Sequence, residues 1–312
     1  MSETRTDMDA LPAALDGLSR IEVSDCEVFD AAVAASGATG WTYYFPYLHF
    51  FSQLSGGERV LFERTANAVL VYRLVRKRDR LTLSLLVPPF PFDHDALDIA
   101  GARMAEVNRD GRQRISRVPE ELAWAVARAG FELRFNDDEY IYDAAQVREM
   151  EGRGYASLRR KIGRFDRDAM DIRPYGAAER AGCEALLEDW RQTLTERGIR
   201  IGPYKTYAQR CLANDGAFHS SRLRGEVIEI DGAIAAFTFG GPIDAESASL
   251  FITVSDHRQP GLAYLQRHRF MAHDPGPRLF NDFVDSGRAG LAQMKRTFRP
   301  VRMHTLLSAR RS

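Results

Sequence analysis

Residues 281–300 constrain the fold of this chain more than any other stretch, because they combine a strand, a turn and a helix. Residues 279–284, with the sequence LFNDFV, have the two-residue alternation of a β-strand. Ser286-Gly287 supplies a turn. Apolar residues then recur every three or four positions from Leu291 to Phe298, and Pro300 ends the helical pattern. The stretch therefore predicts a strand–turn–helix unit.

Polar side chains stand at the junction of this unit. Asp285 follows the predicted strand, and Lys295 lies about two turns into the predicted helix. In open α/β sheets, ligands bind beyond the carboxyl ends of the strands. The junction therefore predicts a ligand site with Asp285, Lys295 and Asn281 as candidate residues, and with Asp282 as an alternative to Asp285. Residue types alone leave a simpler interpretation open, in which Lys295 faces solvent, Asp285 caps the helix and Asn281 satisfies backbone groups.

The composition indicates an ordinary globular protein. Of 312 residues, 45% are hydrophobic and 28% are charged, and the formal net charge is zero, so a polyanion would be bound by local patches. Cys26, Cys183 and Cys211 form no metal or disulfide motif, which favours a reducing cytoplasm. No run approaches the roughly 18 to 20 apolar residues of a membrane span, and the acidic N-terminal stretch is unlike a leader peptide.

The patterns predict a first α/β unit over 21–145, after a mobile or weakly helical arm at 1–20. Runs rich in Val and Leu with short polar breaks predict strands, and apolar residues at helical spacing predict helices. The predicted helices are 25–35, 93–108 and 119–129, and the predicted strands are 59–64, 68–76, 80–87, 131–135 and 139–142.

A second unit is predicted over 146–312. It begins with a basic helix at 153–168, whose apolar residues recur at intervals of three and four. Asp231-Gly232 predicts a hairpin turn inside the strand-like stretch 225–240. Further predicted helices are 177–197 and 262–272, and further predicted strands are 247–254 and 303–309.

Basic residues are concentrated on the predicted basic helix and in the C-terminal segment. If these two regions met in the fold, they would form one basic surface on a neutral protein. Such a surface suits a phosphate backbone, because each neutralised phosphate releases counterions. An ordinary solvated face with ion pairs is the alternative. The candidate nucleic-acid contacts are Arg153, Arg159, Arg160, Lys161, Arg164, Arg296 and Arg299.

Two blocks of the chain resemble one known family. The block nearer the C-terminus holds, in the family's order and spacing, Asn281, Asp285, Gly287, Gly290-Leu291, Lys295 and Pro300. The other is EYIYD at 139–143, followed by GRGYASLRRKIGRF at 152–165. Both are similar to the phosphatidylglycerol lysyltransferase C-terminal domain family, whose members are aminoacyl-tRNA-dependent transferases. The resemblance is expected to cover most of the chain from Tyr43 on. The chain departs from the family at Gly163, where Asn is common, and at Ala292, where Arg is usual.

The resemblance implies a fold and an activity. The fold is α/β (α+β), with two tandem GNAT-like domains, each a central mixed sheet flanked by helices. The activity is transfer of an aminoacyl group from aminoacyl-tRNA to an acceptor amine or hydroxyl, with Lys295 stabilising the negative charge that develops. Asp285 would bind the aminoacyl ammonium or accept a proton, and Asn281 would hold the acceptor or the aminoacyl carbonyl.

The implied partners are aminoacyl-tRNA and an acceptor, with no metal or other cofactor and a cytoplasmic location. A soluble small molecule or peptide is the favoured acceptor. A phosphatidylglycerol-type lipid head group, reached by peripheral contact with a membrane, is the other. The departures at Gly163 and Ala292 bear on this choice of substrate.

Two other functions remain open from the sequence. Arg258, Gly261 and Ala263 fit the loose loop pattern with which acetyl-CoA-dependent GNAT enzymes hold a pyrophosphate, although Pro260 removes one N–H donor from that loop. This pattern predicts an acyl-CoA-dependent N-acyltransferase. The other possibility is a non-catalytic module that binds tRNA or lipid and keeps the same fold.

Overall fold

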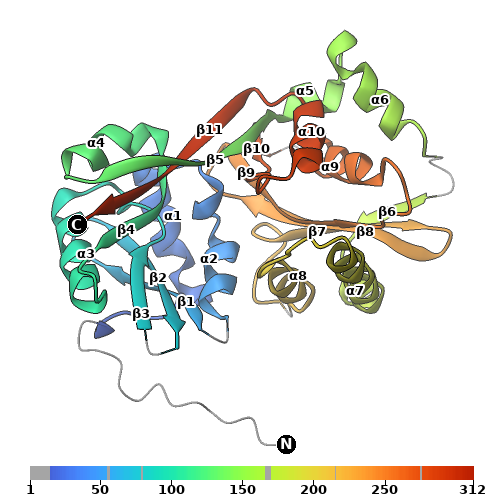
Figure 1. Cartoon of the computed structure of the whole chain (residues 1–312). Helices are drawn as coiled ribbons and strands as arrows, with labels where there is room; N and C mark the ends of the chain where they lie inside the picture. The colour runs from blue at the N-terminus through green and yellow to red at the C-terminus, as the bar shows by residue number, and fades with distance from the viewer. Residues whose placement is uncertain (1–14, 55–56, 79, 166–169, 215, 275) are drawn as a thin grey trace, which may run out of the picture. The chain divides into compact units, whose positions relative to one another are not determined.

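The computed structural model describes residues 15–54, 57–78, 80–165, 170–214, 216–274 and 276–312, which form two compact units (Figure 1). Unit 1 contains residues 15–22, Ser52–Asn136 and Leu307–Ser312, and unit 2 contains Val23–Phe51 and Asp137–Leu306. The units therefore differ from the predicted ranges 21–145 and 146–312, because residues from both ends of the chain join the partner range. Each unit is a mixed sheet flanked by helices, in agreement with the predicted fold class.

Unit 1 is built on four strands in the order β1-β2-β3-β4, in which β3 and β4 are parallel and the other pairs antiparallel. One helix, α3 (His94–Val107), buries Ala96, Leu97, Ala100 and Met104 at helical spacing against this sheet. The other elements are β1 (Glu58–Arg64), β2 (Val69–Lys77), β3 (Arg80–Leu85), β4 (Gln113–Pro119), η4 (Glu120–Leu122) and α4 (Ala123–Arg128). Strand β4 was not predicted, because Arg114, Arg117 and Pro119 interrupt the alternation of apolar and polar residues.

The described end of the predicted arm is packed. Leu15 is buried in the core of unit 1, and Ser19 exchanges backbone hydrogen bonds with Phe62 on β1. Residues 15–20 are therefore not mobile, because an apolar side chain and a backbone bridge hold them. Residues 1–14 of the predicted arm lie outside the described residues.

Unit 2 has a longer sheet in the order β5-β10-β9-β8-β7-β6, in which only β9 and β10 run parallel. The predicted hairpin turn joins β7 and β8, with Asp231 and Gly232 both at positive φ (53° and 76°), as a tight two-residue hairpin turn requires. The strands are β5 (Glu132–Asp143, in unit 2 from Asp137), β6 (Met170–Pro174), β7 (Arg224–Ile230), β8 (Ala233–Pro242), β9 (Ser247–Ser255) and β10 (Leu279–Asn281). Strand β11 (Arg302–Arg311) continues from unit 2 into unit 1.

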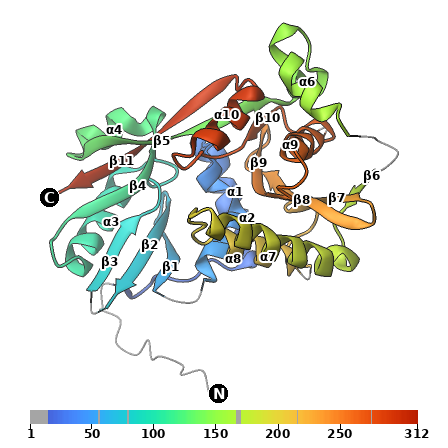
Figure 2. The same cartoon turned by 45° about the vertical axis from the view of Figure 1, so that its right-hand side comes forward.

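Helices cover both faces of the unit 2 sheet. Helix α9 (Leu262–Ala272) lies on one face, and α7 (Arg180–Glu196) and α8 (Tyr204–Leu212) lie on the other (Figure 1). Helix α6 (Ala156–Ile162) packs beside α9 (Figure 2). The remaining helices of this unit are α1 (Cys26–Ser36), α2 (Phe45–Ser52), α5 (Ala144–Glu149) and α10 (Ala289–Thr297).

The aromatic stretch at 41–51 belongs to the core of unit 2. Trp41 Nε1 donates a hydrogen bond to Leu250 O (3.2 Å), and Tyr44 Oη donates one to Arg222 O (2.8 Å). The Trp41 ring also stacks on Phe283, with ring centroids 4.0 Å apart. These contacts explain why Val23–Phe51 belongs to unit 2 although it precedes unit 1 in the sequence.

Several predicted boundaries are wrong. The basic helix ends at Ile162, because Gly163 breaks it, and the last predicted positions, 166–168, lie outside the described residues. The predicted strand 279–284 is only three residues long, β10, because Lys295 and Asn281 hold the next residues in a loop. The predicted strands 131–135 and 139–142 are one continuous strand, β5. None of the helices in the described ranges is long and apolar enough to cross a membrane.

Candidate functional site

The candidate residues lie in or beside a short loop after β10, and all of them belong to unit 2: Asn281 ends β10, Asp285 is in the loop and Lys295 is in α10. The loop joins β10 to α10 at the carboxyl end of β10, as predicted. Phe283 and Ser286 both have φ of 55°, a left-handed conformation that costs energy for residues other than glycine. Such strained backbone persists only where surrounding contacts over-determine it, and it is concentrated at functional sites. The contacts that hold this loop are therefore informative.

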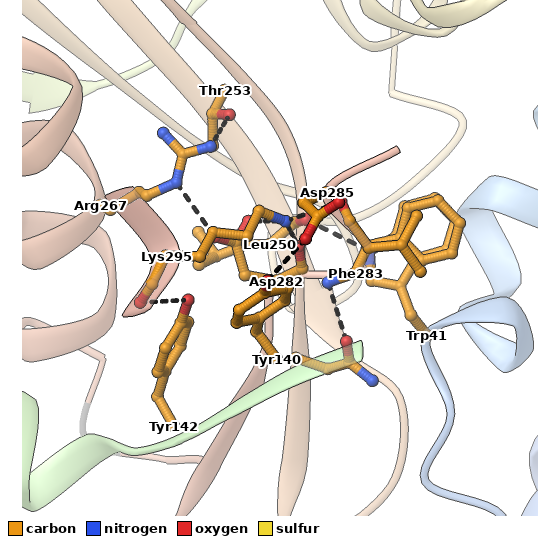
Figure 3. Close-up of polar contacts among 12 residues, drawn as sticks. Trp41, Tyr140, Tyr142, Leu250, Thr253, Arg267, Asp282, Phe283, Asp285 and Lys295 are labelled. Carbon is orange, nitrogen blue, oxygen red and sulfur yellow. Dashed lines mark hydrogen bonds and ion pairs between the residues drawn. The ribbon is translucent and has the colours of Figure 1, made fainter. Parts of the chain in front are cut away.

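The side chain of Lys295 holds the loop in place. It is buried in α10, and its ammonium donates hydrogen bonds to the carbonyl oxygens of Asp282 and Val284, the second at 3.0 Å (Figure 3). Asp282 Oδ1 lies 3.5 Å from the same nitrogen. An ammonium has three donors, so these three oxygens match its capacity. Lys295 thus contacts the loop itself, and its predicted role beside the reacting carbonyl stays a prediction.

Arg267 completes a buried charge cluster with Asp282 and Lys295. Its Nε donates to Asp282 Oδ2 (3.1 Å) and its Nη2 to Thr253 Oγ1 on β9 (2.8 Å). Burial lowers the pKa of Lys295 from 10.5 to about 8; Asp282 opposes this shift, and the Arg267 charge adds to it. Two buried cations therefore share one carboxylate.

Asp285 is the partly exposed carboxylate of the loop. Its Oδ2 accepts a hydrogen bond from Tyr140 Oη on β5 (2.6 Å), and its Oδ1 accepts one from Gly287 N (2.8 Å). Burial, and then the hydrogen bond to Asp285, raise the pKa of Tyr140 to about 12, so the phenol stays a donor. Asp285 does not cap α10, because the residue at the N-cap is Arg288. The carboxylate is fixed in direction and reachable from solvent.

Asn281 is the last residue of β10, and both polar atoms of its side chain form hydrogen bonds. Its Nδ2 donates to Glu139 Oε2 (2.8 Å), and its Oδ1 accepts from Phe283 N (2.9 Å). Glu139 has no exposed surface and also accepts from Trp41 N and from His304 Nδ1, at 2.9 Å for the histidine. Asn281 therefore satisfies backbone and buried carboxylate groups, as the simpler interpretation proposed, and its role as an acceptor contact stays a prediction.

The two basic regions do meet. Tyr155 Oη, at the start of the basic segment, donates to Phe298 O just after α10 (3.4 Å), and the Arg299 guanidinium packs on Gly154 and the Tyr155 ring. Apolar residues of both regions share one core cluster with α9. The condition for a single basic surface is thus met.

The seven predicted basic contacts differ in their surroundings. Arg159 donates to the carbonyl oxygens of Met150 and Gly152, and Lys161 donates to Tyr264 Oη (2.8 Å), so both hold local structure. Arg299 is exposed but packs on its neighbours as described. The other four are exposed on α6, on the segments that flank it, or on α10: Arg153, Arg160, Arg164 and Arg296.

The residues of the loop that fits the CoA pattern are in contact with other parts of the protein. Arg258 pairs with Asp256 (2.9 Å), and Gly261, at φ 101°, lies so close to the Lys161 carbonyl that an added Cβ would be 2.9 Å from that oxygen. Ala263 is in the first turn of α9, and its carbonyl accepts from Arg267 Nη1 (3.4 Å). A carbonyl oxygen at the start of α9 disfavours a pyrophosphate there, because both are negative.

Sequence reasoning missed three residues that build the site, namely Glu139, Tyr140 and Arg267, and it gave Asp282 only as an alternative to Asp285. Arg267 offered no clear signal, because it lies within a run of four polar residues, Gln266 to Arg269, in the middle of α9. Among the described residues, no group of three or more His, Cys, Asp or Glu side chains could hold a metal ion.

The sequence matches the family described as "Phosphatidylglycerol lysyltransferase, C-terminal" over residues 51–262. The fold and this match define the class: a transferase with the GNAT-like architecture. The chain belongs to that family, which confirms the resemblance, although the matched range ends before the loop and Lys295. A search of curated proteins found no match.

Solved structures share the fold over nearly the whole chain. A conserved protein of unknown function from Bacteroides thetaiotaomicron has a TM-score of 0.81 at 18% identity, covering 95% of this chain and 99% of that chain. L-PGS from Bacillus licheniformis has a TM-score of 0.64 at 16% identity, with 93% of each chain covered. FemX has a TM-score of 0.64 at 11% identity, covering 94% of this chain and 96% of that chain.

Proposed function

We propose that this protein transfers an aminoacyl group from aminoacyl-tRNA to an acceptor amine or hydroxyl, without a metal or nucleotide cofactor. The observation that carries the proposal is the loop after β10. A strained loop presents one oriented carboxylate, Asp285, and a buried lysine holds that loop in place. Family membership supports the reaction class.

The reaction needs little acid–base chemistry from the protein, because the aminoacyl ester is already activated. The acceptor nitrogen or oxygen bonds to the aminoacyl carbonyl carbon, and the ester bond to the ribose oxygen breaks. Asp285 accepts the proton that the acceptor loses, and that proton ends on the ribose oxygen. Tyr140 Oη donates a hydrogen bond to Asp285 Oδ2 and keeps this carboxylate pointing in one direction.

The exposed arginines of the basic segment and of α10 are proposed to bind the tRNA. Arg160 and Arg164 come from the basic segment and Arg296 from α10, the helix that carries Lys295. Phosphate contacts of this kind position a nucleic acid without reading its sequence. They would bring the aminoacylated end of the tRNA to the loop. We favour a soluble small molecule or peptide as the acceptor, with a phosphatidylglycerol-type head group as the other candidate.

A transfer assay tests the proposal. Bulk tRNA charged with labelled amino acids is incubated with the protein and either a cell extract or phosphatidylglycerol vesicles, and loss of label from tRNA is followed. We expect loss with the parent protein and a decrease of tenfold or more, about 1.4 kcal/mol in barrier, with Asp285→Asn or Lys295→Ala. Lys205→Ala is the matched control, because Lys205 pairs with the exposed Glu188 on α7.

The outcomes separate the candidate functions. Labelled product from the extract identifies a soluble acceptor, and labelled lipid identifies the head group. Absence of transfer from any charged tRNA, together with label transfer from acetyl-CoA, would sink the proposal in favour of the acyl-CoA alternative. Salt-sensitive tRNA binding with neither activity would indicate a non-catalytic module.

A further inference from the structure

Arg267, Asp282 and Lys295 form a deeply buried cluster of charged side chains. The three side chains are 7%, 4% and 3% exposed, and they come from α9, the loop and α10 (Figure 3). A buried ion pair is a poor way to gain stability, because desolvation offsets the attraction. Three charges in one buried site therefore call for another explanation.

The contacts of Arg267 form a continuous path to the loop. Thr253 on β9 accepts from one end of the guanidinium, and the backbone of Thr253 is bonded in turn to Tyr204 Oη on α8 (2.6 and 3.1 Å). The other end of the guanidinium binds Asp282 Oδ2, which leaves Asp282 Oδ1 for Lys295. Arg267 thus fixes the carboxylate that the ammonium faces.

The direction in which the Lys295 ammonium points depends on this arrangement. With Asp282 held by Arg267, the Lys295 ammonium also binds the Asp282 and Val284 carbonyls, directly before Asp285. Without Arg267, Asp282 would have Lys295 as its sole cationic partner in the cluster. The carboxylate would then compete with the loop carbonyls for the same three donors.

We infer that Arg267 is a positioning residue: acting through Asp282, it keeps the Lys295 ammonium on the loop carbonyls and so fixes the direction of the Asp285 carboxylate. This inference rests on the proposed function only for its effect on transfer. The coupling between Arg267 and Lys295 is a property of the folded protein and can be measured without any substrate.

Lysine composition makes the measurement practical. The chain contains four lysines, Lys77, Lys161, Lys205 and Lys295, among 43 Lys and Arg residues. Protein labelled with 13C-lysine gives four sets of Cε signals, and Lys295→Met assigns the fourth. The midpoint of each lysine titration is then followed by NMR between pH 6 and pH 11.

The expected shifts have opposite signs in two variants. Arg267→Gln removes a cation, so the Lys295 midpoint rises by about one pH unit or more. Asp282→Asn removes the opposing carboxylate, so the midpoint falls. Arg267→Lys keeps the charge and leaves the midpoint near that of the parent. The other groups that face Lys295, Asp285 from the loop and Tyr140 and Tyr142 from β5, are the same in all variants.

Arg191→Gln, on the outer side of α7, is the matched control and leaves the midpoint unchanged. If Arg267→Gln does not fold, Asp282→Asn and Arg267→Lys still test the coupling. A folded Arg267→Gln protein with an unmoved Lys295 midpoint overturns the inference, since a merely structural arginine would behave in that way.

The transfer assay adds the second half of the test. We expect Arg267→Gln to lower kcat by tenfold or more with KM for charged tRNA nearly unchanged, and Arg267→Lys to restore part of the loss. A tenfold rise in KM for charged tRNA would contradict a positioning role. If the parent shows no transfer but the Lys295 midpoint moves as expected, the proposed function fails and the coupling stands.

Discussion

At the scale of single residues, the chain uses lysine sparingly and places one where an arginine would not fit. The Lys295 ammonium is a compact charge with three donors, whereas a guanidinium is a planar fork that matches carboxylates. Carbonyl oxygens two residues apart in a tight loop suit the smaller group. The cost is a charge held away from water, which lowers the pKa of Lys295 to about 8.

This shift predicts a pH dependence of stability. Between pH 8 and pH 10.5 the unfolded chain keeps the Lys295 proton and the folded protein releases it, so the free energy of unfolding rises with pH in that window. From pH 7.5 to 9.5, the parent should gain about 2 kcal/mol relative to Lys295→Met. Urea unfolding at both pH values measures the difference.

Lys205→Met serves as the comparison, because Lys205 is half-buried on the surface and paired with an exposed glutamate. Its stability difference from the parent should not change over this window. A Lys295→Met protein whose difference from the parent is also constant would show that Lys295 titrates normally.

Asn281 gives a second prediction at this scale. Asn281→Leu leaves Phe283 N without its acceptor and removes one donor from the buried Glu139. An unsatisfied buried group costs about 1 to 3 kcal/mol, so the free energy of unfolding should fall by that amount in urea. Asn67→Leu, at an exposed position, should change it by less than about 0.5 kcal/mol. Equal effects of the two substitutions would contradict the described contacts.

The sequence allowed Asn281, Asp285 and Lys295 to be predicted as neighbours, because strand, turn and helix periods place them at one junction. It did not reveal Glu139 or Arg267. Both are charged residues at buried positions, and only tertiary pairing stabilises them there. Periodicity indicates which face is apolar, but it does not show which charge has found a buried partner.

At the scale of elements, α6 and α10 share one core cluster with α9, and both helices carry exposed arginines. We expect Arg160→Glu with Arg164→Glu to weaken tRNA binding and to reduce the slope of log K against log salt by about 1.5 to 2. Filter binding over a range of salt concentrations measures both quantities. Arg128→Glu with Arg134→Glu in unit 1, an equal change of charge, should leave the slope near that of the parent.

The contact between α6 and α9 gives another prediction. Gly261→Ala would place a Cβ 2.9 Å from the Lys161 carbonyl at a backbone φ of 101°, so α6 must shift. A loss of more than about 1 kcal/mol in the free energy of unfolding is expected. Gly290→Ala in α10 meets open space and should be neutral or stabilising by up to about 1 kcal/mol. A neutral Gly261→Ala would show that α6 is not held there.

At the scale of the whole molecule, each unit combines segments that are far apart in the sequence. Unit 1 needs Leu307–Ser312, where Ala309 enters the core and Arg311 donates to Ala129 O (2.6 Å) and Gln113 Oε1 (2.8 Å). The predicted division at residue 145 could not capture this arrangement. Composition and periodicity are local signals, whereas the assignment of Val23–Phe51 and Leu307–Ser312 depends on long-range packing.

A truncation tests this arrangement. Removing Leu307–Ser312 should destabilise β1 to β4, although no residue of those strands is changed, because apolar contacts and the Arg311 hydrogen bonds are lost. Hydrogen exchange followed by mass spectrometry would show faster exchange in 58–119. Removing only the exposed Ser312 is the control. Unchanged protection in 58–119 after the longer truncation would contradict the role given to the C-terminal residues.

The two-segment composition of each unit also bears on how the protein is made. A ribosome releases Val23–Phe51 early, yet the strands against which this segment packs, β5, β9 and β10, emerge much later. Unit 1 likewise waits for the final residues of β11. Neither unit can therefore reach its finished form until β11 has emerged, unlike domains that fold one after another from the N-terminus. Until then the aromatic side chains of 41–51 have no core to enter, and apolar surface exposed in this way makes a nascent chain prone to aggregation.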